Sequence, residues 1–283
     1  MKFAISYSLP FHGADPDRLA GFAQLAEDSG FEAIYVPEHV ALSPGTKFGG
    51  MELPSTLPYP DPLDCLTFVA AATERILLGT GVLLLPYHHP VGLAKRLATI
   101  DHLSKGRMRL LTVGVGSMPT EAQAVGVDFS TRGRRADEAI DVLRLLWESG
   151  ADGASFDGEF YRFENVCSYP KPLDVVQLPI HVGGSSRAAA RRAGARGDGY
   201  FPGGALSDDE RRSQFELARE SAVQAGRDPD ALEYTRWASI DLSAEAVEAY
   251  AAQGVTRLVV SSSVAEPSEQ RDELAAFAAR AGL

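Results

Sequence analysis

The feature of this sequence that most constrains its fold is a repeated alternation of short apolar strands with amphipathic helices. In the first unit, an apolar strand at Phe3–Ser8 is followed by Asp15 and Pro16, an N-cap aspartate before a proline at the first helical position. Gly30 then suits the end of that helix, because glycine adopts the left-handed conformation of a C-cap readily. This unit predicts a strand, a helix and a return to the next strand.

Seven further units follow the first. Their predicted strands are Ala33–Val36, Ile76–Leu85, Met108–Val115, Ile180–Val182, Gly199–Phe201, one between Leu232 and Ile240, and Arg257–Ser261. Alternation of this kind implies a parallel sheet with helical crossovers, and eight units favour a closed barrel over an open doubly wound sheet. We predict one α/β domain over residues 1–283, a single (β/α)₈ TIM barrel. It carries a long loop after strand 2, from Pro37 to about Pro60, and a hairpin-like insertion at 151–178 before strand 5.

Composition and charge exclude several function classes. The formal net charge of −11 argues against general binding of nucleic acid or of an anionic membrane. The sequence has no apolar run of about 18 residues and no secretory leader, so we expect no membrane span. Only two cysteines occur, far apart in the sequence, which is typical of a reducing cytoplasm.

In a barrel, the residues just past the carboxyl end of each strand build the active site. Several of these ends are rich in glycine, which lets a flat or phosphorylated ligand approach the backbone closely. Residues 183–186 also precede a helix, whose first amides favour an anion. Simple punctuation of strand ends explains one glycine pair but not the whole set. No strand end carries a His-x-His pattern, so we predict no metal site and no metal-dependent hydrolase.

A series of short segments then resembles a known family. The segments are 30–39 (Gly-Phe-Glu-Ala-Ile-Tyr-Val-Pro-Glu-His), 73–82, 103–107 leading into 113–116, 158–161, 170–172, 179–185 and 197–200. In this order, over about residues 1–205, they resemble the luciferase-like flavin and deazaflavin oxidoreductases, particularly the branch that uses coenzyme F420.

The resemblance implies roles for individual residues. A non-prolyl cis peptide is implied at Gly81–Val82, where the chain would back the cofactor ring. The implied contacts of the ring and its phosphate are Glu38, His39, Gly81, Val82, Leu83, Gly114, Val115, Gly116, Ser117, Gly183, Gly184, Ser185 and Ser186. Substrate contacts are expected from Tyr7, His12 and Met118.

His39 and Glu38 are the candidate catalytic residues. A hydride that arrives on a carbonyl, imine or conjugated alkene must be matched by a proton, and histidine donates protons well near neutral pH. The alternative is that His39 only hydrogen-bonds the cofactor or the backbone. Glu38 is expected to orient His39 or to bind the ring, and the alternative is a solvated loop carboxylate.

One position departs from the family pattern. Some deazaflavin dehydrogenases of this family place a catalytic glutamate directly after the glycines of strand 4, where this sequence has Ser117. Sugar-phosphate dehydrogenase chemistry is therefore not expected. Glu121 matches a carboxylate found a few residues later in relatives, and its role stays open.

These observations lead to one main hypothesis and two alternatives. We expect an oxidoreductase that transfers hydride between coenzyme F420 and a small organic substrate. The first alternative is an FMN-dependent luciferase-like monooxygenase, and the second is a non-catalytic cofactor-binding protein. Relatives are commonly dimers, so a homodimer is an open expectation.

Overall fold

The structure is a computed structural model that describes residues 1–7, 12–48, 51–204 and 206–283. Its strands are β1 (Lys2–Ser6), β2 (Ala33–Val36), β3 (Lys47–Phe48), β4 (Met51–Glu52), β5 (Leu77–Leu84), β6 (Met108–Gly114), β7 (Ala154–Asp157), β8 (Arg162–Val166), β9 (Ile180–Gly183), β10 (Gly199–Phe201), β11 (Glu233–Trp237) and β12 (Arg257–Ser261). Its α-helices are α2 (Pro16–Asp28), α3 (Pro62–Ala72), α4 (Pro90–Leu103), α5 (Pro119–Ala124), α6 (Arg132–Glu148), α7 (Arg187–Arg196), α8 (Asp208–Gln224), α9 (Ala244–Ala252) and α10 (Pro267–Ala281).

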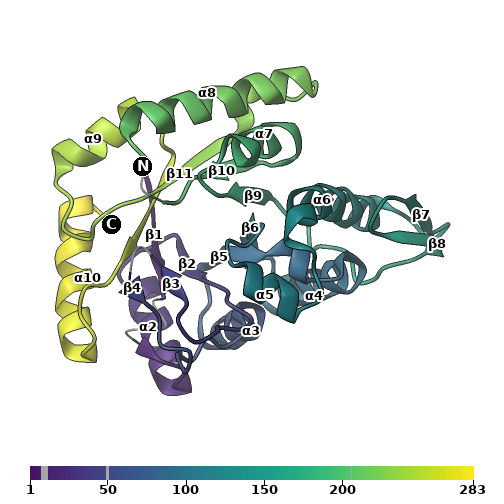
Figure 1. Cartoon of the computed structure of the whole chain (residues 1–283). Coiled ribbons are helices and arrows are strands. Elements are labelled where there is room, and N and C mark those ends of the chain that lie inside the picture. The colour runs from purple at the N-terminus through teal and green to yellow at the C-terminus, as the bar shows by residue number, and fades with distance from the viewer. Residues whose placement is uncertain (8–11, 49–50, 205) are drawn as a thin grey trace.

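Eight of the strands close into a barrel in the order β1-β12-β11-β10-β9-β6-β5-β2. All neighbours in the barrel run parallel. Each barrel strand is followed by a helix, and the helices lie around the outside of the strands (Figure 1). The predicted (β/α)₈ barrel is therefore confirmed.

Local sequence signals account for the helix ends. The side chain of Asp15 accepts a hydrogen bond from the amide of Arg18 at 2.9 Å, and Asp61 caps α3 in the same way. Gly30 has φ +86°, the left-handed conformation that an L side chain avoids, and it follows the end of α2. The predicted element boundaries agree with the observed ones to within a few residues. Ser8, the predicted end of the first strand, lies outside the described residues.

Two segments differ from the prediction in detail. The loop at 37–60 is not wholly irregular, because β3 and β4 form a short antiparallel pair within it. Helix α5 was not predicted, since its six residues are too few to show a helical period. The insertion at 151–178 does contain a hairpin, β7 and β8, which projects beyond α6 (Figure 1).

The barrel interior is filled rather than open. A compact cluster of buried side chains, separate from the main core between strands and helices, occupies it: Ala4, Ala33, Tyr35, Leu110, Phe201 and Val259. Near the amino ends of the strands, Arg257 pairs with Glu32 and Glu233. We call the amino ends of the strands the base of the barrel and the carboxyl ends its mouth. Because the interior is packed, a ligand of any size must bind at one of these two ends.

No helix among the described residues is both long and apolar enough to cross a lipid bilayer. In the same part of the chain, no group of three or more His, Cys, Asp or Glu side chains is placed to hold a metal ion.

Candidate active site

Glu38 lies at the mouth, directly after β2, and turns toward the end of β5. Its carboxylate accepts a hydrogen bond from the backbone amide of Leu84 and lies 2.8 Å from Nε2 of His88. The side chain is 3% exposed. Glu38 thus ties β2 to the segment after β5, and among the described residues it makes no hydrogen bond to His39. The predicted orienting of His39 by Glu38 has no support in this geometry.

His39 is paired with a different carboxylate. Its Nδ1 lies 3.3 Å from Oε1 of Glu121, the residue whose role the sequence left open. The same Oε1 accepts a hydrogen bond from the backbone amide of Val40 at 2.7 Å. The ring of Tyr59 stands edge-on to the imidazole, with centroids 4.9 Å apart. Residues from the loop after β2 and from α5 therefore meet around His39.

Glu121 is buried yet held in its ionised form. Burial alone raises the pKa of a carboxyl group, because it disfavours the charge. Here the hydrogen bonds from His39 and from the amides of Val40 and Ala41 outweigh burial, so the pKa of Glu121 lies below its ordinary value. The mouth therefore contains a buried negative charge beside a histidine whose side chain is 17% exposed.

The glycines of the mouth make room for neighbouring side chains. The implied cis peptide at Gly81–Val82 is present. A Cβ atom at Gly114 would lie 2.5 Å from Cγ2 of Val82, and one at Gly183 would lie 2.5 Å from Cγ1 of the same residue. A Cβ atom at Gly116, which has φ +77°, would lie 2.3 Å from the hydroxyl oxygen of Tyr87. Gly114 and Gly183 are thus required by Val82, which is half-buried at the rim.

The segment before α7 has the geometry of an anion site. Gly184 has φ +118°, and the exposed Ser185 and Ser186 lead directly into the helix. Oγ of Ser186 accepts a hydrogen bond from the amide of Ala189, so the cap satisfies one amide of the first helical turn, and the amides of the two residues before it have no intrahelical partner. Arg187 is exposed at the same end of the helix. Free amides and the helix dipole together favour a negatively charged group here.

The three residues predicted to contact the substrate, Tyr7, His12 and Met118, are buried. The rings of Tyr7 and His12 are 5.0 Å apart, and both side chains are buried. Burial lowers the pKa of His12 to about 4, and its Nδ1 accepts a hydrogen bond from Gln270 at 2.9 Å. Met118 is buried at the start of α5, whereas the neighbouring Ser117 is exposed. Contact of Tyr7, His12 and Met118 with a substrate stays a prediction.

Four residues of the mouth were not singled out from the sequence as site residues: Tyr59, Tyr87, His88 and Trp237. Trp237 ends β11, is 38% exposed, and lies 4.9 Å from the ring of Phe201. The signal for Trp237 was its place at a strand end, but the sequence placed that strand only within a range of nine residues. Tyr59 carries no such signal, because it lies at the end of the long loop after β2, whose path back to His39 no local pattern specifies.

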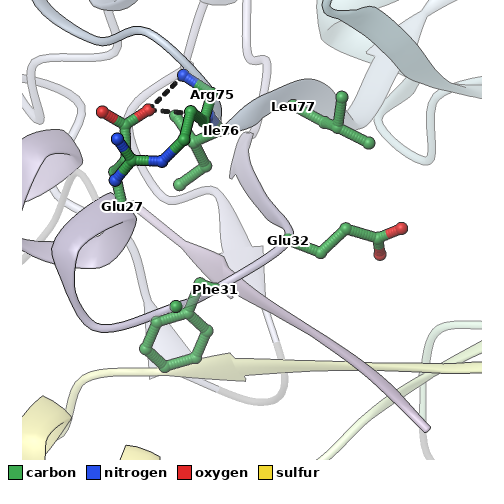
Figure 2. A pocket seen from close by; sticks show the side chains of 7 residues that line it. Glu27, Phe31, Glu32, Arg75, Ile76 and Leu77 are labelled. Atoms are coloured by element: carbon green, nitrogen blue, oxygen red, sulfur yellow. Dashed lines mark hydrogen bonds between the residues drawn. The ribbon is translucent and has the colours of Figure 1, made fainter. Parts of the chain in front are cut away.

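A cavity of about 320 Å³ lies at the base of the barrel, between the turns that precede β2 and β5. Figure 2 shows the carboxylate of Glu27 bonded to the backbone of Arg75 and Ile76 there, with Glu32 and Leu77 on the other side. In (β/α)₈ enzymes the chemistry takes place at the carboxyl ends of the strands, and the base serves stability. The mouth is therefore the candidate active site.

Fold and mouth together define a (β/α)₈-barrel enzyme whose site combines a histidine–carboxylate pair with an anion-binding helix end. The model of the luciferase-like monooxygenase family matches residues 1–282. The chain belongs to this family, as the sequence segments indicated.

Two curated relatives are named F420-dependent glucose-6-phosphate dehydrogenase. The protein from Beutenbergia cavernae is 33% identical over 257 residues, which cover 81% of this chain and 71% of the relative. The protein from Nakamurella multipartita is 34% identical over 190 residues, 66% of this chain and 52% of the relative. The chain thus spans about half the length of the second of these relatives. Their names belong to the branch of the family that the sequence resembles.

Solved structures agree on the fold. A monooxygenase from Streptomyces bottropensis is 25% identical, with a TM-score of 0.69 and coverage of 100% of this chain and 80% of that one. An F420-dependent secondary alcohol dehydrogenase is 19% identical, with a TM-score of 0.78 and coverage of 98% and 97%. At this identity the second likeness concerns the fold alone.

Proposed function

We propose that this protein is an oxidoreductase that transfers hydride between coenzyme F420 and a small organic substrate. The observation that carries the proposal is the similarity, at 33% identity over 257 residues, to a relative named as F420-dependent, together with a family match that spans the chain. The proposed activity differs from that of these relatives in its substrate, because Ser117 departs from the family pattern on the substrate side of the mouth.

The residues of the mouth fit a flat, phosphorylated cofactor. Val82 presents a half-buried apolar surface at the rim, and Gly114 and Gly183 allow it to lie there. The N-terminus of α7, with Ser185 and Ser186, suits the phosphate. The hydroxyl of Tyr87 is buried without a hydrogen-bond partner among the described residues, and a polar ligand atom would satisfy it. Val82, Ser185, Ser186 and Tyr87 are thus the proposed holders of the cofactor.

Bound F420 supplies a carrier of two electrons as hydride, so the protein must supply binding, orientation and a proton. Reduction of a C=O bond needs one hydride at carbon and one proton at oxygen. His39 is the proposed proton donor, because it is partly exposed at the mouth and histidine is the side chain best suited to proton donation near neutral pH. In the reverse direction the same side chain accepts the proton.

The proposed substrate is not a sugar phosphate. Ser117 occupies the position at which the resemblance implies a catalytic glutamate, and its side chain is exposed. Oxidised F420 with glucose 6-phosphate is expected to give no reduction of F420 beyond that of a protein-free control. Turnover with this sugar phosphate at rates typical of enzymes would contradict the proposed departure from these relatives.

The proposed cofactor is tested by titrating the purified protein with oxidised F420 and, separately, with FMN. We expect saturable quenching of F420 fluorescence at micromolar concentrations and much weaker binding of FMN. Absence of F420 binding at those concentrations would reject the proposal. Stoichiometric binding without turnover on a broad panel of carbonyl, imine and conjugated-alkene substrates would instead favour a non-catalytic cofactor-binding protein.

The second candidate function is an FMN-dependent monooxygenase. The likeness to the Streptomyces bottropensis monooxygenase over the whole of this chain favours it. This alternative expects consumption of oxygen with reduced FMN, supplied by a separate flavin reductase. The proposed hydride transfer with F420 expects none.

We further propose a cytoplasmic homodimer. Cys65 and Cys167 are both free thiols, as suits a reducing compartment. Light scattering after size-exclusion chromatography tests the dimer, for which twice the mass of 30.3 kDa is expected.

A further inference from the structure

Glu121 has more hydrogen-bond donors than a solvated side chain would collect. Its Oε1 accepts from the amide of Val40 at 2.7 Å and from that of Ala41 at 3.4 Å. Nδ1 of His39 lies 3.3 Å from Oε1 and 3.4 Å from Oε2. The side chain is 1% exposed. One carboxylate of α5 thus binds three consecutive residues of the loop after β2, so it determines where His39 stands.

The charge of Glu121 determines how the imidazole is protonated. An ionised carboxylate only accepts hydrogen bonds, and the amides of Val40 and Ala41 are obligatory donors that keep it ionised. The atom of His39 that faces it must therefore be a donor, Nδ1–H, in the neutral and in the protonated ring alike. The neutral ring carries one proton, so its Nε2 is then an acceptor. Among the described residues, Nε2 has no recorded hydrogen-bond partner.

We propose that Glu121 is a positioning residue that holds the neutral imidazole of His39 as the Nδ1–H tautomer, so that Nε2 is the atom that exchanges the substrate proton. The edge-on ring of Tyr59 supports this by limiting rotation of the imidazole plane. The inference rests on the proposed function for the meaning of the proton exchange, but the tautomer itself is a property of the protein alone.

The other charged and titratable groups around His39 are already engaged. Glu38 is bonded to His88 and to the amide of Leu84. Burial and the nearby charge of Glu121 raise the pKa of Tyr59, and the same causes raise the pKa of Tyr87 to about 12, so both phenols stay neutral. Arg132, whose charge acts on Tyr87, donates to the carbonyl of Phe129. His39 is therefore the group beside Glu121 that is left to exchange a proton with the substrate.

The test is the substitution Glu121→Gln, followed by ¹⁵N–¹H correlation spectra of the histidine side chains. The wild-type protein has six histidines, and the spectrum of His39→Gln identifies the signal of His39. We expect Nδ1–H in the neutral wild-type ring. When the glutamine oxygen accepts from Val40, its NH₂ group replaces Oε2, which lies 3.4 Å from Nδ1 of His39. A donor at that place disfavours Nδ1–H, so the variant should shift toward the Nε2–H tautomer. A wrong tautomer in a comparable triad lowers turnover by about 10⁴-fold, and we expect a fall of at least about 10²-fold here.

The matched control is Glu27→Gln at the base of the barrel. The carboxylate of Glu27 also binds consecutive backbone amides, those of Arg75 and Ile76 (Figure 2) and that of Glu74, and it contacts no histidine among the described residues. The Glu27→Gln variant should have a less stable fold but the same His39 signal and the same turnover as the wild type. The same tautomer in wild type and Glu121→Gln, or Nε2–H in the wild type, overturns the proposal.

The spectra are recorded first without F420 and then with F420 bound. If wild-type protein fails to bind F420, the proposed function fails, whereas the spectrum of the free protein still decides the tautomer. If Glu121→Gln does not fold, the wild-type spectrum alone decides it, since Nε2–H there excludes the proposed role.

Discussion

The carboxylates at the two ends of the barrel have different partners. At the base, Glu32 and Glu233 flank the guanidinium of Arg257, whose side chain is 1% exposed. At the mouth, Glu38 and Glu121 are bonded to backbone amides and to histidines whose side chains are 17–18% exposed. At the base, Glu32 and Glu233 thus bond to a permanently charged side chain, whereas at the mouth Glu38 and Glu121 bond to histidines, a residue type whose charge can change.

This difference suits the base to stabilising the fold and the mouth to proton transfer. The hydrogen bonds of Arg257 with Glu32 and Glu233 overcome the effect of burial and raise its pKa, so it stays charged at any pH of interest. Burial raises the pKa of Glu233, but the bonds from Arg257 dominate and lower it to about 2. Such a network cannot deliver a proton near neutral pH. Histidine side chains can exchange protons in that range. At the mouth, Glu38 and Glu121 each contact one histidine, His88 and His39 respectively.

The largest expected effect comes from the mouth. His39→Ala should reduce turnover with the true substrate and F420 by about 10²–10⁴-fold, the usual loss when a general acid is removed. F420 affinity should stay within about tenfold, because the other proposed contacts remain. Steady-state kinetics and a fluorescence titration measure the two quantities separately. An unchanged rate would remove His39 from the role of proton donor.

At the base, Arg257→Leu should leave turnover per folded molecule unchanged but destabilise the fold. Removing Arg257 leaves Glu32 and Glu233, whose side chains are 25% and 29% exposed, without their buried partner. Loss of such charged hydrogen bonds costs about 1–3 kcal/mol in the free energy of unfolding. Lys2→Ala is the matched control, since Lys2 contacts the same Glu233 but has a side chain that is 48% exposed. An exposed ion pair contributes only about 0–1 kcal/mol. Equal losses in the two variants, measured by urea unfolding, would contradict the contrast between a buried and a surface pair.

The fold at both ends of the barrel was predictable from the sequence, because helix caps and apolar strands are specified by residues close together in the chain. Asp15 and Asp61 mark helix starts, and the strand that contains Arg257 was predicted with its observed bounds, Arg257–Ser261. These signals act within a few residues, so a single sequence contains them. The hairpin of β3 and β4 was missed because it is only two residues long on each side.

The candidate site was predictable only in part. Strand ends in a barrel converge, so Glu38 and His39 could be placed at the mouth without a structure. Their partners could not be assigned, because 82 positions separate His39 from Glu121 and 50 separate Glu38 from His88. Pairing across such distances depends on the path of the connecting loops, which no local pattern specifies. The neighbouring acid, Glu38, was therefore favoured as the partner of His39 over the distant one.

The base also contains a buried histidine, His181, so the stability of the fold is expected to depend on pH. Burial lowers the pKa of His181 to about 4, below the value near 6.5 of an unfolded chain. Between these values the unfolded state binds more protons, so stability should fall as the pH is lowered from about 6.5 toward 4. The expected loss from His181 is at most about 1.4 kcal/mol for each pH unit in that window.

Urea unfolding at pH 7 and pH 5 measures this loss. His181→Gln should show a smaller difference between the two pH values than the wild type. The control is His102→Gln, because His102 is exposed on α4. If His102→Gln flattens the pH dependence as much as His181→Gln does, the buried histidine is not its source.

The smallest expected effect concerns the anion site before α7. Arg187→Ala should weaken F420 binding by only a few-fold, since an exposed charge near a helix end contributes about 0.3–1 kcal/mol and is screened by salt. Arg196→Ala is the control on the same helix, because Arg196 lies at its other end and is paired with Asp141. The difference between the two variants should shrink as ionic strength rises, unlike the effect of Arg257→Leu at the base. Loss of affinity in both variants, with no dependence on salt, would mean that the charge of Arg187 does not reach the cofactor phosphate.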